Sequence, residues 1–529
     1  MGSLYIGSSG LQTSQNALNT TAHNLSNVDT TGYTRQQVQQ SNRAYVTLST
    51  DPKSIANKQT GLGVTYSRVK QVRDYFLDKT YRKESGRSMF YEVSTEVMEE
   101  VESQLGELNG EAFQTTMTDF WTAIQELSKD PSSSVTQGML VQRATEFVQR
   151  AGAVYSGLSS YQNNLNTQIK QNVDKINKYG NQLLTLNDQI RAIESGGIEH
   201  ANDLRDARNQ ILDELAELTN MTFSEDRYGS VSVQIEGVDF VKDGTCYEIA
   251  LKTDEATGFY TPFWPQDATY TVRADGTRDY NIDGAEVFDL SVEISSDLNT
   301  DIGGLKAMLL ARGDHRANYT DLAEGKYDSV SQSVVMNIQG EFDQMIHNVV
   351  TKVNDILAKA AGVQTGDLKL ADGTTRPNVR YCVSDPNGYM RMEDGSPIQL
   401  FTKVTTDGYE KVIGEDGSED KETADALKAA FTEEAYTLNP NVQKKTTFVD
   451  YYTDLVSQVS NSGYVFRSIY ENQVTTVEAT QSAREQVIGV STDEELSNMI
   501  KFQNAYNASS RYINVISEML DHILSTLGV

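Results

Sequence analysis

The first stretch of the chain decides the fold: MGSLYIGSSGLQTSQNALNTTAHNLSNVDTTGYTR, residues 1–35. Leucine recurs in it at every seventh position, at Leu4, Leu11, Leu18 and Leu25. An apolar residue at this period predicts a helix that presents one seam to a partner helix. We expect the helix to end near Gly32, because a glycine after a polar run is a C-terminal stop signal.

This first helix carries no charge. The first charged residue of the chain is Asp29, and the positions between the leucines are mainly Ser, Thr, Asn and Gln. Uncharged polar side chains can be buried against a neighbour at a lower desolvation cost than charged ones. The pattern favours packing against other subunits. Two alternatives stay open: a short amphipathic helix of an ordinary monomer, and a Ser/Thr-rich export signal.

The last helix of the chain carries a second seam of the same period. Ser491 or Thr492 can cap its N-terminus, and Glu494 and Glu495 are favourable in its first turn. The apolar members of this seam are Met499, Phe502, Tyr506, Ile513, Ile516, Leu520, Ile523 and Leu527. Because two seams of one period can face each other, we expect the chain ends to pair and the middle to project from that stem.

The middle of the chain alternates between long helices and strand-rich segments. Helical periodicity predicts helices at about 74–107, 111–129, 133–194, 203–218, 302–361 and 447–486. The third would extend roughly 90 Å at 1.5 Å per residue, a length typical of rods and coiled coils. Period-two alternation predicts strands at 45–48, 231–235, 247–251 and 270–272. The rest of 34–72 and the acidic run 415–422 are predicted to be extended or looped.

The predicted fold is mainly α with a β-rich insert: paired terminal helices forming a coiled-coil core domain, a long-helix bundle domain and outer β-rich domains. A chain of 529 residues is too long for a single core. The predicted domains are an axial core of 1–72 with 488–529, a long-helix domain of 73–221 with 299–361 and 446–487, a β-rich outer domain of 222–298, and a turn- and β-rich outer insertion of 362–445.

Composition excludes several classes of function. The formal charge is -29, and such a field repels phosphate backbones and anionic membranes, so we expect neither nucleic acid nor membrane as a partner. No apolar run approaches the roughly 18–20 residues that span a bilayer. The N-terminus lacks the basic region, apolar core and small-residue cleavage site of a secretory signal peptide.

No catalytic or metal-binding pattern is found in the sequence. The five histidines are scattered, and HExxH, P-loop, GxGxxG and GxSxG patterns are absent. The two cysteines, Cys246 and Cys382, cannot form a disulfide framework or a CxxC pair, and whether they pair with each other stays open. We therefore predict no catalytic residues, no cofactor and no metal, and a protein that is not an enzyme.

The two ends resemble a known family. Asn16-Ala17-Leu18 and the run Asn-Leu-Ser-Asn-Val-Asp-Thr-Thr-Gly-Tyr-Thr-Arg at 24–35 resemble the N-terminal signature of flagellar rod, hook and hook-associated proteins. The continuation Tyr-Thr-Arg-Gln at 33–36 is most similar to the hook-associated protein 1 branch. The runs 489–495 and 501–506 are similar to that family's C-terminal helix, and 204–210 and 303–305 also look familial. The segments 222–298 and 362–445 carry no such resemblance.

The resemblance implies a structural subunit of the bacterial flagellum that self-assembles at the hook–filament junction and connects hook to filament. It implies a homo-oligomer with the hook protein on one side and the filament junction protein on the other. It also implies an export chaperone and type III export to the extracellular flagellum without a cleaved signal peptide. The assembly interface would comprise the two seams together with Asn24, Asn27, Gly32 and Tyr33.

Three alternatives remain. The chain could be another flagellar axial protein, a hook or distal rod protein, although the long helices at 74–218 argue against proteins that are mainly β outside their core. An axial protein with an enzyme in its variable middle is disfavoured, because no metal or nucleophile set falls in 222–445. An axial protein whose middle domain binds surface ligands, such as carbohydrates or host molecules, stays open.

Overall fold

The computed structural model divides the chain into two compact units. It describes residues 2–50, 57–106, 113–131, 133–196, 200–274, 276–323, 325–360, 367–369, 375–377, 403–405, 408–410, 421–526 and 528. Unit 1 comprises 1–87, 175–248 and 473–529, and unit 2 comprises 88–174 and 249–472. Three long helices contribute residues to both units: α2 (Tyr75–Leu105), α4 (Ser134–Glu194) and α10 (Phe448–Ile488). The four domains predicted from the sequence stay a prediction.

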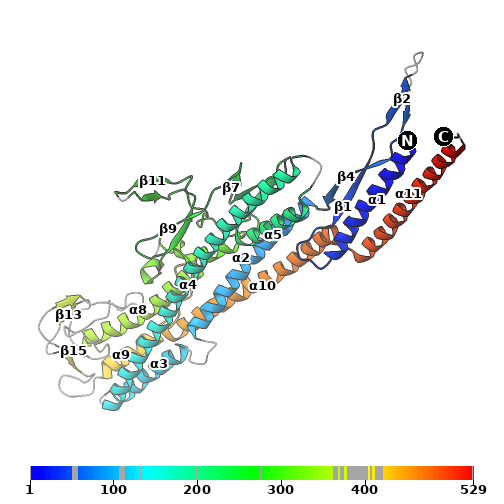
Figure 1. The fold of residues 1–529 in the computed structure, drawn as a ribbon. Coiled ribbons are helices and arrows are strands. Elements are labelled where there is room, and N and C mark those ends of the chain that lie inside the picture. Colours follow the sequence, from blue (N-terminus) through cyan, green and yellow to red (C-terminus); the bar gives the residue numbers. More distant parts are fainter. Residues whose placement is uncertain are drawn as a thin grey trace. The chain divides into compact units, whose positions relative to one another are not determined.

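Unit 1 contains both terminal helices. Helices α1 (Gly2–Ser26) and α11 (Thr492–Thr526) run side by side (Figure 1). Strands β1 (Gln36–Asn42) and β4 (Val64–Gln71) pair antiparallel and contact α1, and β2 (Val46–Thr50) pairs with β3 (Asn57–Thr60). Residues 34–72 were expected to be extended or looped with a strand at 45–48; that strand corresponds to β2, and β1, β3 and β4 are further strands that the sequence did not predict. The Gln- and Ser-rich strands lack the apolar alternation by which strands are recognised.

The rest of unit 1 packs helices on a four-stranded antiparallel sheet. Helix α5 (Asn202–Leu218) precedes strands β5 (Met221–Glu225), β6 (Val231–Ile235), β7 (Val238–Lys242) and β8 (Thr245–Cys246). The predicted alternation of β6 is confirmed, since Val231, Val233 and Ile235 are buried. Cys246 is partly buried, and burial raises the pKa of its thiol to about 11. Cys382 lies outside the described residues.

Unit 2 combines a helical core with short antiparallel hairpins. Its further helices are α3 (Phe113–Lys129), α6 (Gly304–Arg312), the 3-10 helix η2 (Tyr319–Leu322), α7 (Asp328–Ser331), α8 (Val334–Ala360) and α9 (Lys421–Thr432). Its strand pairs are β9 (Ala250–Thr253) with β10 (Tyr260–Phe263), β11 (Thr269–Val272) with β12 (Arg278–Asn281), β13 (Asp367–Lys369) with β14 (Thr375–Pro377), and β15 (Lys403–Thr405) with β16 (Gly408–Glu410).

Aromatic side chains fill the core of unit 2. Phe113 contacts the rings of Phe147, Phe342 and Tyr452 at centroid distances of 4.9–5.3 Å, and all four are fully buried. Buried rings of this size supply much of the apolar area removed from water. The predicted helices of this region correspond to α2, α3, α4, α6, α8 and α10. The mainly α fold with a β-rich insert is thereby confirmed.

One helix of unit 2 contradicts the prediction. Helix α9 lies within 362–445, which we expected to be turn- and β-rich. Its sequence KETADALKAAFT is rich in good helix formers and buries Ala424, Leu427 and Phe431 on one face. This short helix was not predicted, because the Asp-Gly and Asn-Gly dipeptides before it indicated turns. Most of the acidic run 415–422 lies outside the described residues.

A buried carboxyl group whose hydrogen-bond donors among the described residues are neutral amides lies in unit 2. The Glu341 side chain accepts hydrogen bonds from Asn439 Nδ2 at 2.7 Å and Gln458 Nε2 at 3.0 Å, and from Asn337 Nδ2 at 3.3 Å. Burial raises the pKa of Glu341 to about 7, although these hydrogen bonds act in the opposite direction. The folded state therefore binds this proton more tightly than the unfolded chain does.

We predict that Glu341→Gln changes the pH dependence of unit 2. A pKa of about 7, raised from 4.5, gives stability that is complete below 4.5 and is lost as the pH rises through 7. Because glutamine does not titrate, the Tm of the variant minus that of the parent should rise by several degrees between pH 5 and 8. Fluorescence of Trp121 and Trp264 reports on unit 2, which contains both tryptophans. The exposed Glu434→Gln is the control, and a Tm difference independent of pH for Glu341→Gln would contradict the prediction.

Candidate subunit-assembly site

Helices α1 and α11 approach closely at two glycines. A Cβ atom on Gly7 would lie 2.7 Å from Ile513 Cγ1, and one on Gly10 would lie 2.8 Å from Ser509 Oγ. The leucines of the N-terminal seam, Leu4, Leu11, Leu18 and Leu25, are half-buried. So are Met499, Phe502, Tyr506, Ile513 and Ile516 of the C-terminal seam. The terminal helices pair as expected, and glycines as well as leucines set their spacing.

The far end of α11 extends past α1. Gly7 lies against Ile513, so the antiparallel register places the start of α1 near residue 518. Beyond it, Met519 and Leu524 are 59% and 57% exposed, and Leu520 and Ile523 are 41% and 50% exposed. The expectation that Leu520 and Ile523 belong to the paired seam is wrong, because α1 has 25 residues and α11 has 35. Leu527 lies outside the described residues. We call Met519, Leu520, Ile523 and Leu524 the overhang.

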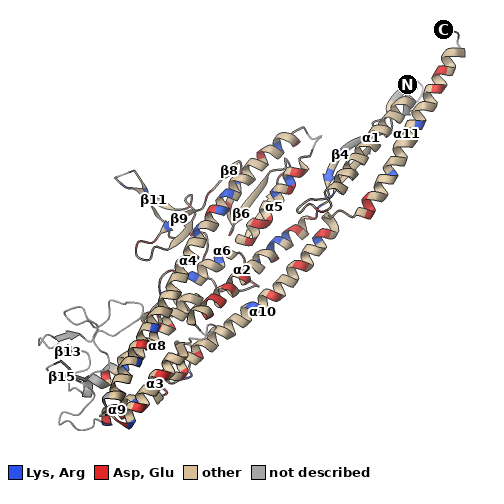
Figure 2. Ribbon diagram, turned by 60° about the horizontal axis from the view of Figure 1, so that its bottom comes forward, with Lys and Arg blue, Asp and Glu red and all other residues tan. Residues whose placement is uncertain are grey.

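A second face of α1 packs on the β1–β4 hairpin. Ser9 Oγ accepts a hydrogen bond from the Val64 backbone N–H at 3.3 Å, and Ser9, Thr13 and Ala17 are buried. The remaining face carries Tyr5, Ser8, Gln12, Gln15, Asn19, Ala22 and Ser26, which are all exposed. We call these seven residues the uncharged face. Figure 2 shows that α1 has no Lys, Arg, Asp or Glu, whereas α11 has both signs of charge; the one basic residue of α1 is the exposed His23 near its end.

Asn24 fixes the chain where it leaves α1. Its side chain is 1% exposed; Nδ2 donates to the Gln36 carbonyl at 2.8 Å, and Oδ1 accepts from the Gln36 N–H at 3.0 Å. Tyr33 Oη also donates to Asn24 Oδ1 at 2.8 Å. Burial, followed by the nearby Asp206 carboxylate, raises the pKa of Tyr33, so its hydroxyl remains a donor. The structure thus brings together two residues of the N-terminal signature.

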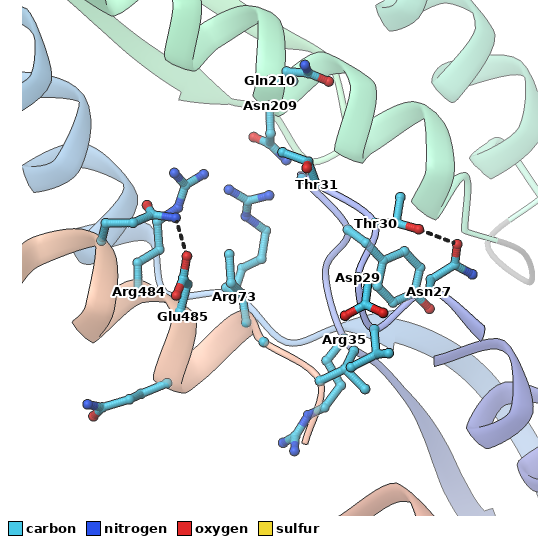
Figure 3. A pocket seen from close by; sticks show the side chains of 18 of the residues that line it. Asn27, Asp29, Thr30, Thr31, Arg35, Arg73, Asn209, Gln210, Arg484 and Glu485 are labelled. Carbon is cyan, nitrogen blue, oxygen red and sulfur yellow. Dashed lines mark hydrogen bonds between the residues drawn. The ribbon is translucent and has the colours of Figure 1, made fainter. Parts of the chain in front are cut away.

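The other two signature residues shape the turn after α1. Asn27 Nδ2 donates to the His23 carbonyl at 2.9 Å, and Asn27 Oδ1 accepts from Thr30 Oγ1 at 3.2 Å (Figure 3). Gly32 has φ of 80°, in the left-handed region that favours glycine. Helix α1 ends at Ser26, so Gly32 terminates the following turn rather than the helix itself.

An ionic network that sequence reasoning missed lies beside this turn. Asp78 accepts from Arg73 Nη2 and from Arg484 Nε, both at 2.8 Å. Asp213 accepts from Arg484 Nη2 and from Arg82 Nε, both at 2.7 Å. These residues come from the segment before α2, from α2 itself, from α5 and from α10, which are far apart in the sequence. Single charged residues within long helices gave no sequence signal of this convergence.

The arginines of the network stabilise the charged form of Asp78. Burial alone would raise the pKa of Asp78, but the Arg73 hydrogen bond and the charges of Arg73, Arg484 and Arg82 lower it below its ordinary value. Burial lowers the pKa of Arg82, although Asp213 opposes that shift. A guanidinium between two carboxylates acts as a structural tie. No nucleophile with a neighbouring base is evident in this network.

The backbone after α1 is tied to the same network. Buried Thr34 donates its N–H to Asp206 Oδ2 at 3.3 Å, and Gln71 Nε2 donates to Asp206 Oδ1 at 2.8 Å. Arg35 donates its backbone N–H to the Ile488 carbonyl and its Nη1 to Glu494 Oε2, at 2.8 Å and 2.7 Å. Asp206 belongs to the familial run 204–210, and its role was not predicted. These bonds join the exit of α1 to α5 and to the start of α11.

A polar cleft of about 780 Å³ adjoins these bonds (Figure 3). Its walls come from residues 27–33, α5, the end of α10 and the turn 489–491, and include Asn209, Gln210 and Glu485. Among the described residues, no three His, Cys, Asp or Glu side chains form a group able to hold a metal ion. None of the described helices is long and apolar enough to cross a bilayer.

Comparisons with known proteins agree with this arrangement. A model of the flagellar hook-associated protein FlgK helical domain matches residues 98–370, just over half of the chain. The chain belongs to the FlgK family of flagellar hook-associated proteins. A flagella basal body rod protein model matches residues 4–34, which include most of α1. A flagellar basal body rod FlgEFG protein C-terminal model matches 484–526, which include α11.

FlgK relatives match almost the full length. The chain is 24% identical to flagellar hook-associated protein 1 of Bacillus subtilis over 98% of this chain and 97% of that protein. It is also 24% identical to the proteins of the same name from Escherichia coli and Salmonella typhimurium, over 98% of each chain. The flagellar hook junction protein FlgK from Burkholderia pseudomallei shares the fold with a TM-score of 0.51 at 13% identity. The alignment covers 78% of this chain and 100% of that one.

The predicted family and function are confirmed at this level. The chain is a FlgK-family structural component of the bacterial flagellum, at the hook–filament junction. The individual residues assigned to the assembly interface stay a prediction. Two internal runs, 204–210 and 303–305, also resembled the family. The first contains Asp206, which accepts the hydrogen bond from the Thr34 N–H. The second contains Gly304, which packs so closely on Met89 that a Cβ on Gly304 would lie 2.7 Å from Met89 Cγ.

We predict that Asn24→Ala loosens the segment after α1. The substitution removes three hydrogen bonds and leaves the partly buried N–H and carbonyl of Gln36 without this partner, at a cost of about 1 kcal/mol per lost bond. The amide of Gln36 should exchange its hydrogen at least 10-fold faster, as measured by NMR or mass spectrometry. Asn19→Ala, on the uncharged face of the same helix, is the matched control. Unchanged exchange at Gln36 in Asn24→Ala would contradict this role.

We predict that Gly7→Val separates α1 from α11. The added side chain would meet Ile513 and Tyr512, at 2.7 Å and 3.0 Å from its Cβ. Faster amide exchange is expected in both terminal helices. Gly152→Val in α4 is the matched control, because a Cβ there has no neighbour within 4 Å. Equal effects of the two substitutions on helix protection would show that valine propensity, and not the close approach, is responsible.

Proposed function

We propose that the chain performs its junction role by self-assembly through the stem of α1 and α11. The observation that carries this proposal is a pair of exposed surfaces on the stem, the uncharged face and the overhang. Both belong to unit 1 and neither is covered by the described residues of that unit. A stem of two helices and a hairpin buries little area of its own, so further burial between copies would stabilise it.

The uncharged face suits contact with another protein subunit. Its hydroxyl and amide side chains can donate and accept hydrogen bonds across an interface. Burying them costs less than burying Lys or Glu, which must be paired or neutralised. Long charged side chains on the same face would also lose more conformational entropy on packing. Helix α11 and strands β1 and β4 cover two faces of α1. The composition of α1 therefore favours a third contact, in which another subunit covers the uncharged face.

The overhang suits an apolar contact. Four large apolar side chains lie within six residues of one helix, beyond the point where α1 can cover them. Clustered exposed apolar residues mark interaction surfaces more often than scattered ones do. The occupant that we propose is another copy of this chain, because the overhang continues the seam on which α1 already packs.

We propose further partners from the family. The chain would contact the hook protein on one side and the filament junction protein on the other. An export chaperone and the flagellar type III apparatus would bring it to the extracellular flagellum without removal of a signal peptide. What supports this is the family itself, whose relatives are named hook-associated and hook junction proteins. The charge of -29 disfavours nucleic acid and anionic membranes as partners.

We infer that the chain is not an enzyme. The acidic groups at the assembly site, Asp78 and Asp213, are bound by arginines that hold them in place. Residues used in this way orient segments of chain and are not available as acids or bases. The family assignment to a structural flagellar protein supports the same inference. A hook or distal rod protein is the less favoured alternative, because the matching family model describes the FlgK helical domain.

We predict that Leu520→Asp prevents assembly and leaves the monomer folded. Leu520 is 41% exposed in the single chain, so its aspartate should not lower the Tm, but a charge in a buried contact between copies would be costly. In a strain lacking the protein, this variant should give hooks without filaments by electron microscopy. Leu298→Asp, at a 61% exposed leucine of unit 2, should restore filaments. Normal filament growth with Leu520→Asp would rule out the overhang as an assembly contact.

A further inference from the structure

The one Asn-Pro bond of the sequence lies in the loop between α9 and α10 of unit 2. Asn439 is buried, whereas Pro440, which follows it, is exposed. Tyr436 and Thr446 form an antiparallel bridge across this loop, with a hydrogen bond of 2.8 Å from the Thr446 N–H to the Tyr436 carbonyl. The bond is therefore held in an ordered loop, with the asparagine on the core side and the proline at the surface.

An asparagine that precedes a proline has restricted chemistry. At most asparagines the next backbone nitrogen can attack the side-chain amide, but a proline nitrogen carries no hydrogen and is blocked. The side-chain nitrogen of such an asparagine can still attack its own backbone carbonyl carbon, and this attack cuts the chain. The two atoms belong to one residue, so covalent geometry keeps them close. The attack requires a base for the amide proton and a donor for the carbonyl oxygen.

Glu341 occupies the position of the base. Its Oε1 accepts a hydrogen bond from Asn439 Nδ2 at 2.7 Å, and Gln458 Nε2 donates to both carboxylate oxygens, at 3.1 and 3.0 Å. Glu341 is fully buried, and its charge raises the pKa values of Tyr327 and Tyr451, the titratable side chains that face it. Burial raises the pKa of Glu341 to about 7, so its carboxylate is a stronger base than an exposed one.

Two backbone N–H groups act on the other atoms of Asn439. The Val442 N–H donates to the Asn439 backbone carbonyl at 3.1 Å, and the Asn441 N–H donates to Asn439 Oδ1 at 3.0 Å. The first bond stabilises the negative charge that develops on a carbonyl oxygen under attack. The second withdraws electrons from the side-chain amide and makes its N–H more acidic. A simple turn needs both bonds, but it does not need a buried carboxylate on the amide nitrogen.

We propose that the bond between Asn439 and Pro440 cleaves itself. Glu341 takes a proton from Asn439 Nδ2 as this nitrogen bonds to the Asn439 carbonyl carbon. The bond from that carbon to the Pro440 nitrogen breaks, and the proton passes to the proline nitrogen, directly or through solvent. One product ends in a succinimide at residue 439, and the other begins with the free amine of Pro440. The reaction uses no oxidant and no co-reactant, and water only opens the succinimide afterwards.

The cleaved chain would stay folded, because both sides of the loop are anchored in the core. Phe431 of α9 and Phe448 of α10 are buried, and their ring centroids lie 5.3 Å apart. Tyr451 Oη also donates to the Leu438 carbonyl at 3.1 Å. Each chain reacts once, so the cleavage does not make the protein an enzyme. The proposal goes beyond the assembly role, which uses the stem in unit 1.

Intact-mass spectrometry of the purified full chain, incubated for days at pH 8, tests the proposal. Fragments 1–439 and 440–529 should appear, the first lighter by one water than the corresponding acid. Glu341→Gln keeps a hydrogen-bonding side chain but lacks the base, so cleavage should slow at least 10-fold. Asn439→Ala should not cleave at this bond. The exposed Glu434→Gln, in the same loop, is the matched control and should stay within about 2-fold of the parent rate. The parent rate should fall between pH 8 and pH 5, as Glu341 becomes protonated.

The outcomes separate self-cleavage from proteolysis and from loop unfolding. The proposal is overturned if the full chain stays intact, or if Glu341→Gln cleaves as fast as the parent. It is also overturned if fragment 1–439 carries an ordinary carboxylate from the earliest time, since that product indicates a protease. A cleavage rate that follows Tm across the variants, instead of the presence of Glu341, would equally contradict it. Assembly defects at Leu520 would not affect any of these measurements.

Discussion

Arg484 between two carboxylates is the interaction on which unit 1 depends. Its guanidinium binds Asp78 and Asp213, and through them it joins α10 to α2 and α5. Buried ion pairs give little net stability compared with apolar packing, but removal of one partner costs about 3–5 kcal/mol. A network of this kind therefore specifies one arrangement of its helices. The chain leaves α1 towards the elements that this network holds. It enters α11 from α10, which carries Arg484.

The terminal stem follows a different physical rule. Its helices are spaced by Gly7 and Gly10, its turn is fixed by Asn24, and the exposed face of α1 has no Lys, Arg, Asp or Glu. Unit 1 thus combines a strongly ionic base with a helix that has no Asp, Glu, Lys or Arg. The base determines a single geometry, and the helix leaves its surface available for burial against another protein. The ion pairs fix the geometry and α1 offers a surface for contact, which explains why the first charged residue is Asp29, after α1 has ended.

Much of this architecture could be predicted from the sequence, because it is periodic. The heptad leucines indicated the paired ends, and the 3.6-residue pattern indicated the long helices. Pairwise geometry could not be predicted: the overhang at Leu520 depends on the relative lengths of two helices, and Arg484 meets Asp78 across 406 residues. The β1–β4 hairpin was missed because glutamine-rich strands on a helix lack apolar alternation. Helix α9 was missed because turn-rich sequence surrounds it.

Charge placement links assembly to solubility. With a charge of -29, free chains repel each other, which opposes association anywhere on an acidic surface. Repulsion between exposed charges is screened beyond about 8–10 Å at physiological salt, so it acts mainly at close contact. Contact through α1 brings together surfaces that carry no charge, and contact through the overhang adds apolar burial. The chain can therefore be strongly acidic and still associate, provided that it does so through the stem. In the proposed mode of assembly, specificity would arise because the rest of the surface disfavours contact, and it would require no exceptional affinity of the stem itself.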